Sequence, residues 1–132
     1  MIYLDSCAIV KLIHTEDESA ALTAWLAGRS EVLVTSVLSE VEVPRAVRRT
    51  EPRTLGAVAV ALARLGRVEI DASIRATAAA YVDTSLRSLD AIHVATAEML
   101  LASGRQISDF VTYDKHMAAA ARAAGLTTVA PS

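Results

Sequence analysis

The chain has 132 residues and a formal net charge of −2, and 53% of its residues are hydrophobic while only 4% are aromatic. This length suits one domain, residues 1–132, with its own hydrophobic core, and makes a second independent domain unexpected. Cys7 is the only cysteine, which excludes an internal disulfide and a thiolate zinc site and fits a reducing, cytoplasmic location. Because no run of about 18 apolar residues and no basic-then-apolar leader occurs, we expect neither a membrane span nor a signal peptide.

Hydropathy and charge are unevenly spread. The mean hydropathy of +0.38 is high for a small soluble domain, so we expect a partner or a second copy to cover part of the apolar surface. Eleven arginines accompany two lysines, and six of the arginines lie between Val43 and Val68 with a single acid, Glu51. Guanidinium groups suit bidentate contacts with phosphate or carboxylate, although a solvated helical face has the same pattern.

The first half of the chain alternates strand and helix patterns. Met1–Leu4 predicts a strand that leads directly into a helix from Ser6. Thr15–Glu18 matches a capping box and predicts a helix through about Ala27, ended by Gly28. A strand over Glu31–Thr35 and a helix from Ser36, with Pro44 as an interior irregularity, are expected next.

The second half continues the alternation. We expect helices over Arg53–Leu65, Ser73–Val82, Ser88 to Gly104 and Lys115–Ala124, and strands over Val68–Ile70, Asp109–Asp114 and Leu126–Val129. Gly66, Gly104 and Gly125 are expected to end the helices that precede them. This order predicts a three-layer α/β/α sandwich with a mostly parallel, doubly wound central sheet.

Acidic residues follow two of the predicted strands. In open parallel sheets the ligand site lies beyond the carboxyl ends of the strands, at a switch point in strand order. Asp5 and Asp114 occupy such positions, and Asp90 and Glu42 in the first turns of helices are able to reach the same crevice. Asp90 is also in line with Val94, so its carboxylate is expected on a buried face.

Each of these acids also has a purely structural interpretation. Asp5 and Asp114 would serve as helix N-caps, and Asp90 would interact with the helix dipole. Glu42 would pair with an arginine one turn away, Arg45 or Arg49. The coincidence of four acids, rather than any one of them, favours a functional site.

Converging carboxylates call for a cation. Two of them about 5 Å apart repel by roughly 3 kcal/mol at an effective dielectric constant of 20. Oxygen ligands without clustered His or Cys indicate Mg²⁺ or Mn²⁺, and such ions favour phosphodiester hydrolysis.

Four motifs in register resemble the PIN-domain nucleases, in particular the VapC toxins of bacterial toxin–antitoxin pairs. The motifs span nearly the whole chain and comprise Met1–Ala8, Thr35–Val43, Leu86–His93 and Val111–Asp114. The resemblance implies a Mg²⁺- or Mn²⁺-dependent endoribonuclease that cuts structured RNA such as tRNA or rRNA. It further implies a growth-inhibiting toxin, a VapB-type antitoxin that blocks the site, and a homodimer.

The resemblance also implies roles for individual residues. The acidic set falls on Asp5, Glu42, Asp90 and Asp114, of which Asp5, Asp90 and Asp114 would hold the metal, and the family pattern favours Glu42 over Glu40. Small hydroxyl residues that support the carboxylates fall on Ser6, Ser36 and Thr112. Arg45, Arg48 and Arg49 are expected to border the RNA groove.

Three further residues lie in or beside these motifs. His93 either packs behind the site or touches substrate, and Tyr113 either packs in its strand or stacks on a base. Asp109 begins its strand and is therefore expected at the far end from the crevice.

Two other functions remain open at this point: a housekeeping PIN nuclease of RNA maturation and a non-catalytic α/β phosphoacceptor or binding module. A phosphoacceptor predicts paired acids near the first strand and a lysine after a later one. Asp5 is instead followed by Ser6 and Cys7.

Overall fold

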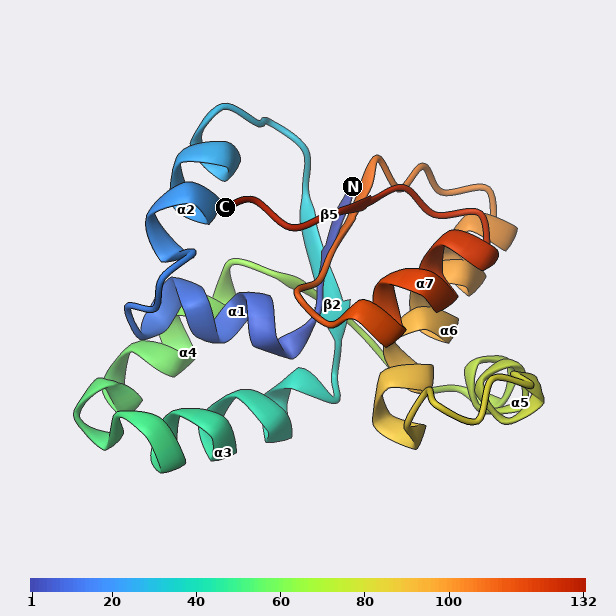
Figure 1. The fold of residues 1–132 in the computed structure, drawn as a ribbon, viewed down its shortest axis with the longest axis horizontal. Helices are drawn as coiled ribbons and strands as arrows, with labels where there is room; N and C mark the ends of the chain where they lie inside the picture. Colours follow the sequence, from blue (N-terminus) through green and yellow to red (C-terminus); the bar gives the residue numbers. More distant parts are fainter.

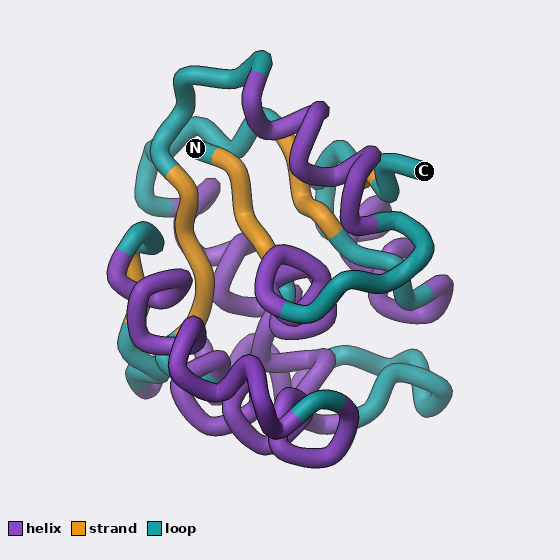
Figure 2. Tube along the Cα trace, turned by 90° about the vertical axis from the view of Figure 1, so that its left-hand side faces the viewer, coloured by secondary structure: helices purple, strands orange, loops and turns teal.

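Five short strands form one parallel sheet at the centre of the molecule. The computed structural model describes residues 1–132, and the strand order across the sheet is β3-β2-β1-β4-β5. The strands are β1 (Ile2–Leu4), β2 (Leu33–Ser36), β3 (Gly66–Val68), β4 (Asp109–Val111) and β5 (Thr128–Val129). All neighbouring strands pair in parallel, and Figure 2 shows them side by side in orange.

Helices cover both faces of this sheet. They are α1 (Ser6–Ile13), α2 (Ser19–Ala27), α3 (Ser39–Thr50), the 3₁₀ helix η1 (Pro52–Ala57), α4 (Val58–Ala63), α5 (Ala72–Ala80), α6 (Ser88–Ala102) and α7 (Lys115–Ala123). In Figure 1, α1 to α4 lie on one side of the strands and α5 to α7 on the other. The predicted three-layer α/β/α sandwich is confirmed. None of the helices has the length and apolarity needed to cross a bilayer.

Side-chain alternation along β1 divides the core in two. Ile2 and Leu4 pack with α1, α2, α3 and α4 on one face of the sheet. Tyr3 points to the other face, where it packs with residues of α6 and α7 and stacks on Phe110 with ring centroids 4.9 Å apart. Because the central strand is buried on both faces, it is apolar throughout.

The strand order reverses next to β1. The chain passes from β1 to β2 and β3 through α1 to α4, and then returns to place β4 on the free edge of β1. Leu4 pairs with Val111, so the segments that follow these two strands begin at the same edge of the sheet. The strands that precede Asp5 and Asp114 are therefore neighbours at the switch point, where the crevice of an open parallel sheet lies.

The capping box predicted at Thr15–Glu18 does not form. Helix α2 begins at Ser19, and the side chain of Glu18 makes no cap bond. The Ser19 hydroxyl instead accepts a hydrogen bond of 2.8 Å from the Glu16 backbone N–H. Glu16 and Glu18 are both engaged by the Lys11 ammonium group, which competes with the local capping pattern.

The segment predicted as one helix over Arg53–Leu65 is two shorter pieces, η1 and α4. Gly66 does not end a helix but opens β3, two residues earlier than the expected Val68–Ile70. A Cβ atom on Gly66 would lie 3.3 Å from Val34 Cγ1, so glycine allows β3 to approach β2 closely. Local composition does not reveal this contact, because it depends on strand pairing.

Gly125 offers a test of backbone conformation without a packing effect. Its φ is +90°, and a Cβ there would meet no atom within 4 Å. We expect Gly125→Ala to lower the free energy of unfolding by about 1 kcal/mol, because the left-handed backbone is strained for alanine. Urea unfolding measures this change.

Gly56 is the matched control, since it too has open space but lacks a positive φ. Gly56→Ala is expected to leave stability unchanged or raise it by about 0.4 to 1 kcal/mol. Equal destabilisation by both substitutions would contradict the backbone explanation.

Candidate active site

Asp5 uses only one of its two carboxylate oxygens for structure. Its Oδ1 accepts a 2.8 Å hydrogen bond from the Ala8 N–H and thereby caps α1. Its Oδ2 is buried and has no hydrogen-bond partner. The capping interpretation is thus correct for one oxygen and leaves the other unexplained.

The surroundings of Asp5 disfavour its negative charge. Burial raises the pKa of this carboxyl group above its ordinary value, and the nearby charge of Asp90 raises it further. The Ala8 N–H and the Thr112 hydroxyl act in the opposite direction without cancelling the effect. His93 also favours the ionised form, so the fold offsets the charge of Asp5 only in part.

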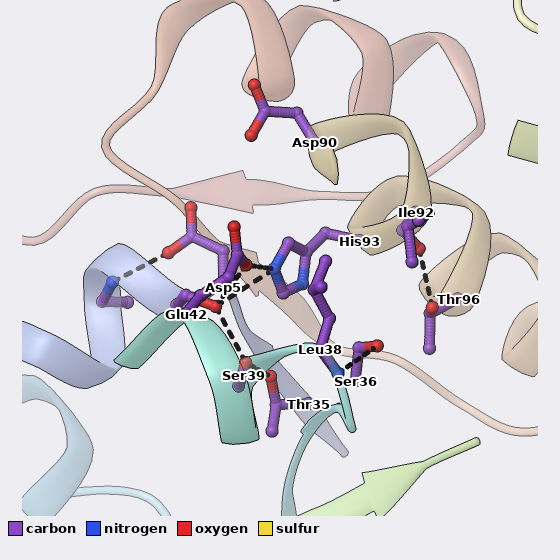
Figure 3. Close-up of polar contacts among 12 residues, drawn as sticks. Asp5, Thr35, Ser36, Leu38, Ser39, Glu42, Asp90, Ile92, His93 and Thr96 are labelled. Atoms are coloured by element: carbon purple, nitrogen blue, oxygen red, sulfur yellow. Dashed lines mark hydrogen bonds and ion pairs between the residues drawn. The ribbon is translucent and has the colours of Figure 1, made fainter. Parts of the chain in front are cut away.

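Glu42 enters the same site from α3. Its Oε1 accepts hydrogen bonds from Ser6 Oγ and His93 Nε2, each 2.7 Å long (Figure 3). Burial opposes ionisation of Glu42, but these two bonds together with the charges of His93 and Arg87 hold the pKa below its usual range. Glu40 is elsewhere and pairs with Arg67 at 3.0 Å. Glu42 rather than Glu40 is thus the acid that lies in the site.

His93 connects Glu42 to the sheet. Its side chain is only 1% exposed, and its Nδ1 lies 2.8 Å from the Tyr3 hydroxyl. Because burial raises the pKa of Tyr3, the phenol keeps its proton. We assign this proton to the bond with Nδ1, which leaves the Nε2–H to donate to Glu42. His93 thus packs behind the site and is too buried to touch substrate.

A chain of hydrogen-bonded hydroxyl groups leads to Glu42 through Ser6. Ser6 Oγ lies 2.9 Å from Ser39 Oγ, which lies 2.7 Å from Thr35 Oγ1. Sequence reasoning missed Thr35 and Ser39, although Ser39 precedes Glu42 by three residues and so shares its face of α3.

The two other predicted hydroxyl residues act on the backbone. Ser36 Oγ accepts from the Leu38 N–H at 3.1 Å and bonds no carboxylate, so its expected supporting role is not seen. Thr112 Oγ1 accepts from the Asp114 N–H at 3.1 Å and thereby holds the turn that carries this acid.

Asp114 and Asp90 complete the predicted acidic set, each with a local partner. Asp114 Oδ1 caps α7 through the Met117 N–H at 2.7 Å. Asp90 pairs with Arg87 at 3.3 Å, and its side chain is 15% exposed. In Figure 3, Asp90 stands apart from Asp5, Glu42 and His93. No three His, Cys, Asp or Glu side chains lie close enough together to hold a metal ion in this conformation.

A cleft opens beside Glu42 and Asp114, and Asp5, Asp90 and His93 do not line it. Its lining includes Ser6, Cys7, Lys11, Glu42, Arg49 and Asp114. Burial raises the pKa of the Cys7 thiol to about 11, and the charges of Asp5, Glu42 and Asp90 add to the shift. Although the acids do not touch, their negative potentials therefore overlap at this cleft.

The three predicted arginines lie on α3, and one of them, Arg49, lines the cleft. Arg45, Arg48 and Arg49 are exposed and form no ion pair. Arg45 is one turn earlier than Arg49, on nearly the same face of the helix. Arg87, which the sequence did not single out, helps to lower the pKa of Glu42 from the opposite side.

Asp109 lies outside this site, as its position at the start of β4 predicts. It pairs with Arg29 at the amino end of the strands.

The raised pKa of Asp5 predicts a pH-dependent cost to stability. A carboxyl group whose pKa is raised by folding contributes stability at low pH, which is lost as pH rises from about 4 through its folded pKa. Asp5→Asn keeps an oxygen for the cap and removes the charge. In EDTA, we expect the variant to be more stable than the wild type at pH 7 by about 1 to 3 kcal/mol, with the difference shrinking toward pH 4.

Thermal unfolding of both proteins across this pH range measures the difference. Asp17→Asn removes an exposed carboxylate that forms no ion pair and serves as the control. A difference between Asp5→Asn and wild type that does not change with pH would contradict the assignment.

Comparison with known proteins agrees with this geometry. The PIN domain family model matches residues 2–123. Over 132 residues, 99% of this chain and 97% of the relative, the protein is 53% identical to Ribonuclease VapC35 of Mycobacterium tuberculosis. It is 40% identical to Ribonuclease VapC46 of the same organism over 131 residues, which cover 99% of this chain and 98% of the relative.

Solved structures share the fold. A crystal structure of Mycobacterium tuberculosis VapC20, described as a sarcin-ricin loop cleaving toxin, superposes with a TM-score of 0.75 and 19% identity over 99% of this chain and 100% of that chain. A chain of a toxin–antitoxin complex from Klebsiella pneumoniae gives a TM-score of 0.73 at 17% identity, covering 100% and 98% of the two chains. The resemblance found in the sequence is therefore confirmed, and the chain belongs to the PIN-domain family, among its VapC-type members.

Proposed function

We propose that the protein is a Mg²⁺- or Mn²⁺-dependent endoribonuclease that hydrolyses phosphodiester bonds in structured RNA such as tRNA or rRNA. In this proposal it acts as a growth-inhibiting toxin and is neutralised by a VapB-type antitoxin. Relatives that are 53% and 40% identical over nearly the full chain bear the name ribonuclease. This degree of similarity supports a ribonuclease activity. The metal ion and the roles of individual residues are argued from the geometry of the site.

The partnerless oxygen of Asp5 carries the proposal. A buried anionic oxygen without a donor is costly unless a ligand compensates it. The surrounding donors are carboxylate oxygens, which suit Mg²⁺ or Mn²⁺, so the chemistry of the set fits the ion although the side chains are not gathered around one point. Asp5, Asp90 and Asp114 would hold it. The bound cation would offset phosphate charge and favour ionisation of a water molecule.

Glu42 is suited to orient the attacking water molecule and to accept its proton. Its Oε1 is fixed by Ser6 and His93, while its Oε2 has no protein partner and is not buried. Because the pKa of Glu42 is lowered, the carboxylate is ionised at neutral pH and able to accept a hydrogen bond or a proton at Oε2.

The surface supports the proposed partners. Arg45, Arg48 and Arg49 offer unpaired positive charge on α3, and Arg49 lines the cleft, which suits binding to an RNA backbone. Large apolar side chains such as Val60 and Val82 are exposed, by 63% and 93% respectively. Their exposure supports the expected coverage of apolar surface by an antitoxin and by a second copy in a homodimer.

Cleavage of RNA tests the central proposal. Purified wild-type protein with Mn²⁺ is expected to cut RNA, and Asp5→Asn or Asp90→Asn is expected to reduce the rate to background, because each removes a charged ligand. Glu69→Gln is the control, since Glu69 is exposed and forms no ion pair. Full activity of Asp5→Asn, with its fold verified by circular dichroism, would refute the assignment.

His93 is expected to act through Glu42. His93→Ala removes the donor that holds Oε1, and the loss of such a supporting contact lowers kcat by about 10- to 100-fold. His14→Ala, which removes an imidazole at the end of α1, should leave kcat unchanged. The pH–rate profile is the deciding measurement. Loss of the Nε2 donor should raise the pKa of Glu42 and move the acidic limb of the profile to higher pH. A merely structural effect would lower the melting temperature without moving the profile.

A further inference from the structure

One lysine lies inside the cleft. Lys11 lines it together with Glu42 and Asp114, and its side chain is only 10% exposed. The only other lysine in the chain is Lys115. A nearly buried ammonium group beside carboxylates proposed for catalysis is not explained by helix solubility.

Two acids hold this ammonium group at the mouth of the cleft. Lys11 Nζ lies 2.8 Å from Glu18 Oε2 and 3.3 Å from Glu16 Oε2. Burial would lower the pKa of Lys11, but these two carboxylates outweigh it and raise the pKa, so the charge is permanent. The two acids belong to the segment between α1 and α2, and both are about one-third exposed.

The position of the charge is set in advance. Nζ lies 4.7 Å from the centroid of the Tyr113 ring, whose hydroxyl donates to the Pro131 carbonyl at 2.9 Å. Packing against the ring restricts the rotamers of Lys11 before RNA binds. The entropy cost of ordering this long side chain on binding is therefore smaller. Meanwhile ion pairs with partly exposed acids are weak, so an incoming anion competes with them readily.

We propose that Lys11 is a substrate-binding residue that contacts an RNA phosphate in the cleft, and that Glu16 and Glu18 occupy its ammonium group until RNA arrives. The proposal rests on the ribonuclease function argued above. It makes Glu16 and Glu18 competitors of the substrate rather than supports of the fold. Substitution of Lys11 should therefore lower the affinity for RNA, whereas substitution of Glu16 and Glu18 should raise it.

Three variants separate these roles: Lys11→Gln, the pair Glu16→Gln with Glu18→Gln, and all three together. Affinity for fluorescently labelled, unfractionated tRNA is measured in EDTA, and kcat and KM are measured with Mn²⁺ on the same RNA. Lys11→Gln should weaken binding about tenfold or more, since a charge-assisted hydrogen bond is lost, with little change in kcat. The slope of log affinity against log salt should fall by about one.

The glutamate pair should show the reverse. Its substitution should tighten binding, and this gain should vanish when Lys11→Gln is also present. Lys11→Arg, which keeps the charge, should restore most of the affinity. Arg67→Gln breaks an exposed ion pair with Glu40, away from the cleft, and should leave binding unchanged.

Two results would overturn the inference. One is a Lys11→Gln protein with a lower melting temperature but wild-type affinity and KM, which would make the ion pairs structural. The other is a gain from the glutamate substitutions that persists without Lys11, which would make the effect one of general charge. A wild-type protein that neither binds nor cleaves RNA would instead overturn the proposed function, and this inference with it.

Discussion

The site depends on the pair of hydrogen bonds that Glu42 Oε1 accepts from Ser6 and His93. Ser6 and Glu42 belong to helices on one face of the sheet, and His93 belongs to α6 on the other. A further hydrogen bond joins Nδ1 of His93 to the Tyr3 hydroxyl in the central strand. The position of the carboxylate is thus fixed jointly by both helical layers, which makes Glu42 a rigid group, as its proposed catalytic role requires.

Asp5 shows the opposite balance between stability and function. Its Oδ1 caps α1, which stabilises the fold, while its Oδ2 is buried without a partner, which costs stability. A strand that ends at the switch point of the sheet brings its next residue into the crevice, so the position suits both tasks. The same residue therefore stabilises the helix start and leaves a vacant acceptor that a cation is able to use.

Sequence patterns predicted the layers and most elements because alternating strand and helix periodicities are local. They failed where tertiary contacts decide. Periodicity alone does not choose between Glu40 and Glu42, which are two residues apart. The family resemblance favoured Glu42, and the contacts of Ser6 and His93 place this acid in the site. Gly66 resembles a helix stop until Val34 is known to lie beside it. Thr35 and Ser39 were missed in favour of Ser36, because neighbouring hydroxyls in a turn differ only in direction.

The basic side chains of this protein fall into two groups, those with an acidic partner and those without one. Arg53 and Arg67 have acidic partners, whereas Arg45, Arg48 and Arg49 have none, and Arg49 lines the cleft. Lys11 is intermediate, since its partners are themselves partly exposed. Unpaired arginines attract an RNA backbone over about a Debye length, roughly 8 to 10 Å in physiological salt, while acids on the cleft floor repel it. In the function proposed above, RNA would approach along the arginine side of the cleft and would reach the acids only where a cation offsets them, so the charge pattern that would admit RNA would also make the acidic floor dependent on a metal ion.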